Sequence, residues 1–353
     1  MKPVYLCGRG LACALGLDVE SALASLRQGG ATPSTCALPG ALGGRFPYYA
    51  IPFAQHGWDE RARQLVQRVA AAADAPQARN GALFIATSSF DIGAVERGEA
   101  RMDHGEFAAK VAAWLQWEGP VYTISTACTS SLNALIAAHA LLSAGEEEEA
   151  LVLGLELDNR LTLGGFAALQ LLSQHGSRPF AAQRDGLVLG EAVAALRLST
   201  RSTASWRLTG GANVVDGSQP TGASAPAVAE MYRRALAAGG LTADAIDLIK
   251  VQAAGSPGND AVEARGLREA FARVPPLVSL KAAIGHSMGA AGAAEIALLT
   301  ACLEHGVWPQ YPHAVDGALG IELAARMPER VRRVLATILG FGGSHATVVL
   351  ERT

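Results

Sequence analysis

A cysteine set among small residues is the first feature of this sequence that could do covalent chemistry. Cys128 lies within the run Ser125–Ser131, between the apolar segment Val121–Ser125 and the apolar stretch Ser130–Ser143. This pattern predicts a strand, a tight turn and a helix, so the thiol lies at a helix N-terminus, where exposed N–H groups and the dipole favour thiolate. Such a turn presents the sulfur outward and its own N–H toward an oxyanion. The run therefore favours a nucleophile, with a merely packed cysteine as the alternative.

The elements that must position this cysteine alternate along the whole chain, which is typical of an α/β protein. The clearest predicted strands are Val4–Cys7, Ala82–Ala86, Leu151–Leu153, Leu248–Val251 and Ala346–Leu350. The clearest predicted helices are Val19–Arg27, Asp59–Ala73 with arginines on its outer face, Phe107–Trp117, Val228–Ala238 and Gly292–Glu304. Pro33–Gln55 is rich in proline and glycine and is expected to be a loop. The later elements repeat the earlier succession, which favours duplication of one half.

The composition argues against several classes of protein. The 353 residues are 50% hydrophobic and 17% charged, which is ample for a large core. A formal net charge of −3 without a long basic run argues against nucleic acid as a partner. Five irregularly spaced cysteines indicate reduced thiols and a cytoplasmic protein. Arg9 interrupts the apolar start, which predicts a buried strand rather than a leader, and no apolar run reaches the ~18 residues of a membrane span.

Further polar motifs follow Cys128 along the chain. They are Ser177–Phe180, Arg184–Ala192, Ser279–Lys281, Gly285–Gly292 followed by Glu295, and Gly340–Ser344. Taken singly, His286 is explained by a turn, Lys281 by a surface charge and Glu295 by a charge on its helix. Taken together with the turn at Cys128, the motifs resemble the β-ketoacyl-acyl-carrier-protein synthases, in that family's order and over nearly the whole chain.

The resemblance implies a thiolase fold, a five-layer α-β-α-β-α sandwich made of two duplicated halves. Residues 1–200 would form the half with the nucleophile, and residues 201–353 the half with the histidine and lysine motifs. The resemblance also implies a homodimer or heterodimer paired through Val121–Ser125. Substrates would arrive on the phosphopantetheine of an acyl carrier protein, and no bound cofactor or metal ion is expected.

The resemblance assigns a role to each matched residue. Cys128 would accept the acyl group, and His286 would polarise the thioester oxygen of a malonyl unit that loses CO₂. Lys281 and Glu295 would organise the polar network around them. Phe341 matches the gate beside the cysteine, and its N–H would complete the oxyanion hole with the N–H of Cys128.

One expected histidine is absent. The family's Ala-His-Gly-Thr motif corresponds here to Ala253–Asp260, in which Ala254 takes the place of the histidine and the loop is two residues shorter. An alanine methyl neither donates a hydrogen bond nor relays a proton. His345, after the glycine loop, and Gln252, two residues before Ala254 on the same strand face, are the candidates to replace the lost donor.

Three functions fit this pattern. The first is a subunit resembling chain-length factors, paired with a complete ketosynthase in a fatty-acid, type II polyketide or aryl-polyene-like assembly. The retained Cys128 argues against it, because chain-length factors commonly lose that cysteine. The second is a self-sufficient acyltransferase or condensing enzyme that uses Cys128 and His286, because a Cys-His pair suffices to form a thioester. The third is a purely structural dimerisation partner.

Overall fold

A large mixed sheet and a small sheet form the frame of the molecule in the computed structural model, which describes residues 1–38, 44–218 and 220–353. The first half contributes to the large sheet the strands β1 (Val4–Cys13), β4 (Ala82–Ala86), β5 (Val121–Ile124), β6 (Glu149–Glu156) and β8 (Ala192–Ser199). The second half contributes β9 (Trp206–Val215), β10 (Leu248–Lys250), β11 (Leu277–Val278), β12 (Arg333–Leu339) and β13 (Ser344–Arg352). The small sheet holds β2 (Ser34–Leu38), β3 (Gly44–Tyr49) and β7 (Leu189–Gly190).

The two halves of the large sheet have the same strand order. From the centre outward, the first half runs β1-β8-β6-β4-β5 and the second runs β9-β13-β12-β10-β11. In each half the two inner pairings are antiparallel and the two outer pairings are parallel. β1 and β9 pair with each other at Val4–Leu208 and Tyr5–Arg207, which joins the halves. The predicted duplication is confirmed.

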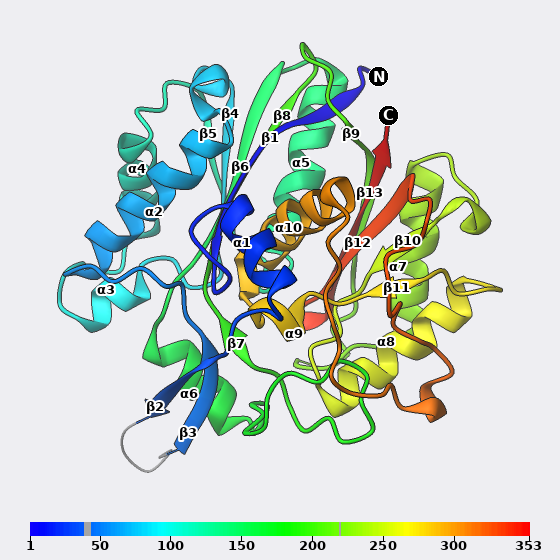
Figure 1. Ribbon diagram of the computed structural model, residues 1–353. Helices are drawn as coiled ribbons and strands as arrows, with labels where there is room; N and C mark the ends of the chain where they lie inside the picture. Colours follow the sequence, from blue (N-terminus) through cyan, green and yellow to red (C-terminus); the bar gives the residue numbers. More distant parts are fainter. Residues whose placement is uncertain (39–43, 219) are drawn as a thin grey trace.

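The helices form three layers around these sheets (Figure 1). Their bounds are α1 (Val19–Arg27), α2 (Trp58–Ala72), α3 (Ile92–Glu96), α4 (His104–Trp114), α5 (Ser130–Ala144), α6 (Arg160–Ala168), α7 (Ala225–Ala238), α8 (Pro257–Ala270), α9 (Lys281–Ile284) and α10 (Ala291–His305). α5 and α10 lie between the two halves of the sheet. α2 and α4 cover the outer face of the first half, and α7 and α8 that of the second. The predicted five-layer sandwich is confirmed.

The central helices are buried because they carry apolar residues on nearly every side. All residues of α10 from Ala291 to Leu303 are buried, and α5 packs Leu132, Leu135 and Leu142 into the same core. Within the described residues, Ala127–Ala144 is the segment long and apolar enough to cross a membrane, and more than half of it is buried in this fold. The segment serves here as the core helix that begins beside Cys128.

Two local predictions differ from the structure. Pro33–Gln55 was expected to be a loop, but β2 and β3 form a hairpin there, and residues 39–43 of that stretch lie outside the described residues. β3 also pairs with the distant β7, and such pairing cannot be read from local composition. The first strand continues beyond Cys7 to Cys13 along β8, because Gly10 has no Cβ that would run into the Val69 carbonyl of α2.

Candidate active site

Cys128 lies in a tight turn between β5 and α5, as the sequence predicts. Ala127, just before it, has a φ of +51°, a left-handed conformation that costs a residue with a side chain about 1–2 kcal/mol. The Ser130 hydroxyl accepts a hydrogen bond from the Thr126 N–H at 2.9 Å and donates one to the Ala127 carbonyl at 2.6 Å. The first residue of α5 therefore holds the turn in the shape that presents the sulfur.

His286 reaches the sulfur from the second half of the chain. Its Nε2 lies 3.0 Å from the Cys128 Sγ, and both side chains are buried. The backbone of His286 is fixed on both sides, because its N–H donates to the Val188 carbonyl at 2.8 Å and its carbonyl accepts from the Gly190 N–H at 3.0 Å. The fold thus brings the predicted nucleophile and the predicted histidine into direct contact.

Burial sets the resting protonation of this pair. It raises the pKa of the Cys128 thiol to about 12, while the Lys281 charge and the N–H groups of Phe341 and Cys128 act in the opposite direction. Burial also lowers the pKa of His286 well below its usual value, and the charges of Lys281 and Lys250 lower it further. The pair therefore rests as a thiol and a neutral imidazole, which can take the thiol proton during an acyl transfer.

Phe341 stands beside the cysteine at the turn between β12 and β13. Its ring stacks on Phe166 of α6, with centroids 5.2 Å apart and planes 19° apart. Its backbone N–H and the N–H of Cys128 both lower the pKa of the Cys128 thiol. These are the two N–H groups that the sequence predicts for the oxyanion hole.

Lys281 and Glu295 form a buried ion pair, and Lys250 joins it as a second lysine. Lys281 Nζ contacts Glu295 Oε1, while Lys250 Nζ lies 2.6 Å from Glu295 Oε2 and donates to the Thr337 carbonyl at 2.6 Å. All three charged side chains are essentially inaccessible to solvent. Lys250 was not among the predicted site residues, although a lysine that interrupts the apolar run Leu248–Val251 is an available signal.

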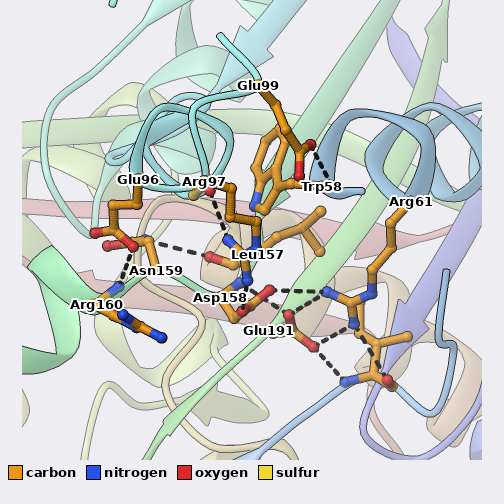
Figure 2. Close-up of polar contacts among 12 residues, drawn as sticks. Trp58, Arg61, Glu96, Arg97, Glu99, Leu157, Asp158, Asn159, Arg160 and Glu191 are labelled. Atoms are coloured by element: carbon orange, nitrogen blue, oxygen red, sulfur yellow. Dashed lines mark hydrogen bonds and ion pairs between the residues drawn. The ribbon is translucent and has the colours of Figure 1, made fainter. Parts of the chain in front are cut away.

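A second polar network, shown in Figure 2, fixes one wall of the site. Arg61 of α2 binds both carboxylate oxygens of the buried Glu191, at 2.6 and 2.7 Å. Glu191 also accepts from the Asp158 N–H at 2.9 Å, just before α6. Glu96 accepts from the Arg160 and Leu161 N–H groups at the start of α6. The network anchors α6, the helix that presents Phe166 to Phe341.

The arginines of α2 were expected on the outer face of that helix, but Arg61 points inward because Glu191 binds it.

Position 254 offers only an apolar surface. The Ala254 methyl is buried in a cluster with Phe166, Leu189 and Met288, against which Phe341 packs. The backbone of this loop is nevertheless firmly held. The Asp260 carboxylate accepts from the N–H groups of Ala254 and Gly255, at 3.2 and 3.1 Å. The backbone of this loop is therefore held in place, although the side chain at position 254 cannot donate a hydrogen bond.

The structure separates the two candidates to replace that donor. Ser344 contacts Thr129, the residue after Cys128. The next residue, His345, pairs with Leu339, which belongs to the outer cluster, the apolar core between the second half of the sheet and the helices α7 and α8. His345 therefore lies on the strand face turned away from Cys128. Gln252 lies on the inner face, since its neighbours Val251 and Ala253 pack in the outer cluster. Its buried Oε1 has no hydrogen-bond partner among the described residues.

No group of three or more His, Cys, Asp and Glu side chains in the described ranges has an arrangement that could hold a metal ion.

Sequence comparison identifies relatives over most of the chain. The family models described as "Beta-ketoacyl synthase, N-terminal domain" and "Beta-ketoacyl synthase, C-terminal domain" match residues 85–204 and 207–315. Erythronolide synthase EryA2 of Saccharopolyspora erythraea is 30% identical over 332 residues, which cover 83% of this chain and 9% of that protein. Actinorhodin polyketide putative beta-ketoacyl synthase 1 of Streptomyces coelicolor is 32% identical over 269 residues, 69% of this chain and 57% of that protein.

Structural comparison supports the same assignment of the fold. A chain of the complex between the ketosynthase ApeO and its chain length factor ApeC from Xenorhabdus doucetiae matches with a TM-score of 0.86 and 24% identity, over 100% of this chain and 98% of that one. A beta-ketoacyl synthase from Burkholderia phymatum STM815 matches with a TM-score of 0.84 and 21% identity, over the full length of both chains. The repeated strand order, the buried Cys128–His286 pair and these matches agree: the chain has the thiolase fold and belongs to the beta-ketoacyl synthase family.

Proposed function

We propose that this chain is a ketosynthase-like subunit that takes an acyl group from an acyl carrier protein onto Cys128 and works in the cytoplasm as the partner of a complete ketosynthase. The dimer would elongate a fatty-acid, polyketide or aryl-polyene chain. One contrast within the site carries this proposal. The Cys128 Sγ lies 3.0 Å from His286 Nε2, whereas Ala254 presents only a methyl group in an apolar cluster.

The geometry supports acyl transfer as a complete sequence of steps. The Cys128 sulfur attacks the thioester carbonyl of the carrier protein's phosphopantetheine while His286 Nε2 takes the thiol proton. The N–H groups of Cys128 and Phe341 bind the oxyanion that forms. When this intermediate collapses, the pantetheine sulfur leaves and takes the proton from His286. Neither a bound cofactor nor a metal ion enters these steps.

Decarboxylative condensation is less well supported by this site. Loss of CO₂ from a malonyl thioester leaves negative charge on the thioester oxygen, and among the histidines of the described residues His286 is the one in contact with Cys128. Removal of one preorganised donor typically costs about 10²–10³ in rate. We therefore assign the condensing turnover to the partner subunit.

The free edge of the large sheet supports a partner. β5 is the last strand of the order, and Val121 and Tyr122 on it are 37% and 42% exposed. An apolar edge strand of this kind invites pairing with another strand. The edge leads directly into the turn that carries Cys128, so a partner paired there lies beside the nucleophile.

The second candidate function is a self-sufficient acyltransferase or condensing enzyme. The intact contact between Cys128 and His286 favours it, because thioester formation needs no further side chain. A purely structural partner is the third reading, and it predicts that Cys128 stays unmodified.

The decisive experiment is intact-mass analysis after incubation with acyl-carrier-protein thioesters, with and without a candidate partner ketosynthase. The proposal expects an acyl adduct on Cys128 in both samples, and elongated product only with the partner. Elongated product from the chain alone would establish the second candidate. An unmodified chain in both samples would leave only the structural role.

Partner binding is tested separately with Tyr122→Asp. A charge on the exposed edge should abolish association or give insoluble protein, as measured by light scattering. A wild-type chain that remains monomeric at micromolar concentration, alone and with candidate partners, would refute the dimer.

A further inference from the structure

The chain uses arginine for almost every positive charge. It has 25 arginines and four lysines, Lys2, Lys110, Lys250 and Lys281. Two of the four lysines are buried together on the single carboxylate of Glu295. A lysine ammonium is a more compact charge than a guanidinium, so two of them can approach one carboxylate. Lysine at both buried positions therefore allows two cations to share one acid.

Burial lowers the pKa of Lys250 to about 8, so below that pH this cluster carries one positive charge more than its carboxylate neutralises. A further acid whose charge acts on Lys250 is Glu263 of α8, whose carboxylate accepts from the Gln252 and Ala253 N–H groups at 2.7 and 2.8 Å. Burial raises the pKa of Glu263 to about 7, so this acid is protonated below neutral pH. Glu156 of β6 accepts hydrogen bonds from the Ser88 N–H and from the hydroxyls of Ser88 and Ser89.

His286 lies next to the segment that carries Lys281, because the N–H of Gly285, the residue before it, donates to the Lys281 carbonyl at 3.0 Å. Both lysines oppose protonation of the imidazole, and its Nε2 contacts the neutral thiol of Cys128. Its buried Nδ1 has no hydrogen-bond partner among the described residues, so no acceptor there stabilises an imidazolium. The same positive field stabilises a thiolate or an oxyanion at the sulfur.

We propose that Lys250 is a positioning residue that makes the cluster on Glu295 cationic, keeps His286 neutral and favours negative charge at Cys128. The inference rests on the proposed roles of Cys128 and His286. The charge of this cluster thereby compensates in part for the donor that position 254 lacks.

The test follows the titration of His286 directly. The chain is labelled with ¹³Cε1-histidine, its eight histidine signals are recorded by NMR from pH 5 to 8, and His286→Gln identifies the signal of interest. In the wild type, His286 stays a neutral imidazole throughout. In Lys250→Met the cluster becomes a neutral pair, and the pKa of His286 should rise by about one unit or more.

Four further variants separate an electrostatic role from a structural one. Lys281→Met removes the other lysine and should shift His286 in the same direction, which also serves if Lys250→Met does not fold. Glu295→Gln makes the cluster more cationic and should leave His286 neutral. Lys250→Arg keeps the charge, and Lys2→Met changes an exposed charge, so both should resemble the wild type.

The proposal is overturned if the pKa of His286 in the folded variants that lack either buried lysine is no higher than in the wild type, or if Lys250→Arg shifts it as much as Lys250→Met. This measurement needs no acyl donor. A shifted His286 in a chain that never acylates would refute the proposed function alone, and an acylating chain with an unmoved His286 would refute only this inference.

Discussion

The loop that carries His286 and the loop that carries Ala254 both have their backbones pinned by hydrogen bonds. The N–H and carbonyl of His286 pair with Val188 and Gly190 of the β7 region. The Ala254 loop is instead held by two buried acids of α8, Asp260 and Glu263. The first loop presents an imidazole to Cys128, and the second presents a methyl group.

The two loops are alike in their firmly held backbones and differ in the side chain that they present to the site. A loop that had lost its role through disorder would not keep two buried carboxylates on four backbone N–H groups, because burying an acid is costly without such partners. The backbone at position 254 is therefore maintained for the fold, while the donor is absent. The loss concerns one step of the chemistry and leaves the site's architecture in place.

The largest expected effect is the loss of acylation when the partner of His286, Cys128, is replaced. Cys128→Ser should abolish stable acylation by carrier-protein thioesters and alkylation by iodoacetamide, because a serine hydroxyl beside a neutral imidazole is a far weaker nucleophile. Intact-mass analysis measures both reactions. Cys302→Ala, which removes another buried thiol on α10, is the matched control and should acylate normally. Adducts that persist in Cys128→Ser would place the reactive thiol elsewhere.

The next effect is a loss of stability when the hydrogen bonds that hold the Ala254 loop are disrupted. Asp260→Asn replaces one acceptor oxygen with an amide donor that faces the N–H groups of Phe180, Ala254 or Gly255. The free energy of unfolding should fall by about 3 kcal/mol, as for other broken buried networks. Denaturant unfolding measures this loss, with the exposed Asp244→Asn as the control. A loss no larger than that of the control would show that the loop does not depend on this carboxylate.

A smaller effect is the pH dependence of stability. Burial raises the pKa of Glu263 from 4.5 to about 7, so the folded state holds its proton more tightly than the unfolded state. Its contribution is present in full below pH 4.5 and is lost as pH rises through 7, by about 2 kcal/mol between pH 5 and 7.

Unfolding curves at pH 5 and pH 7 check this dependence. Glu263→Gln should lower the stability at both values and reduce its fall with pH, whereas the exposed Glu269→Gln should keep the fall seen in the wild type. An unchanged fall in Glu263→Gln would assign the dependence to other groups.

The smallest effect is a gain in malonyl decarboxylation when a hydrogen-bond donor is restored at position 254. Ala254→His should raise malonyl decarboxylation at least about tenfold, because the backbone that would carry the imidazole is already in place. Release of CO₂ from malonyl-carrier protein is the measurement, and Ala254→Leu, which adds bulk without a donor, is the control. An unchanged rate in a folded Ala254→His protein would mean that the shortened loop also misplaces the pantetheine, which favours the partner-subunit role.

Much of this molecule follows from its sequence. The strand-turn-helix pattern around Cys128 and the motifs at Lys281, His286, Glu295 and Phe341 are local, and a resemblance over the whole chain places them in one fold. The duplication is also readable, because each half repeats the same alternation of apolar strands and helices. The hairpin of β2 and β3 is not, because pairing with the distant β7 outweighs a composition typical of a loop.

The candidate catalytic residues could be identified from the sequence alone. They are a cysteine at a helix start, one histidine between glycines and an alanine where a second histidine was expected. The side chains and charges around them became known only from the tertiary structure. It turned His345 to the outer face of β13, placed Lys250 beside Lys281 on one carboxylate and pointed Arg61 inward to Glu191. The physical reason is that nucleophile type and helix position are local properties of a chain. Charge balance and side-chain direction depend on residues that meet only when distant strands and helices pack together.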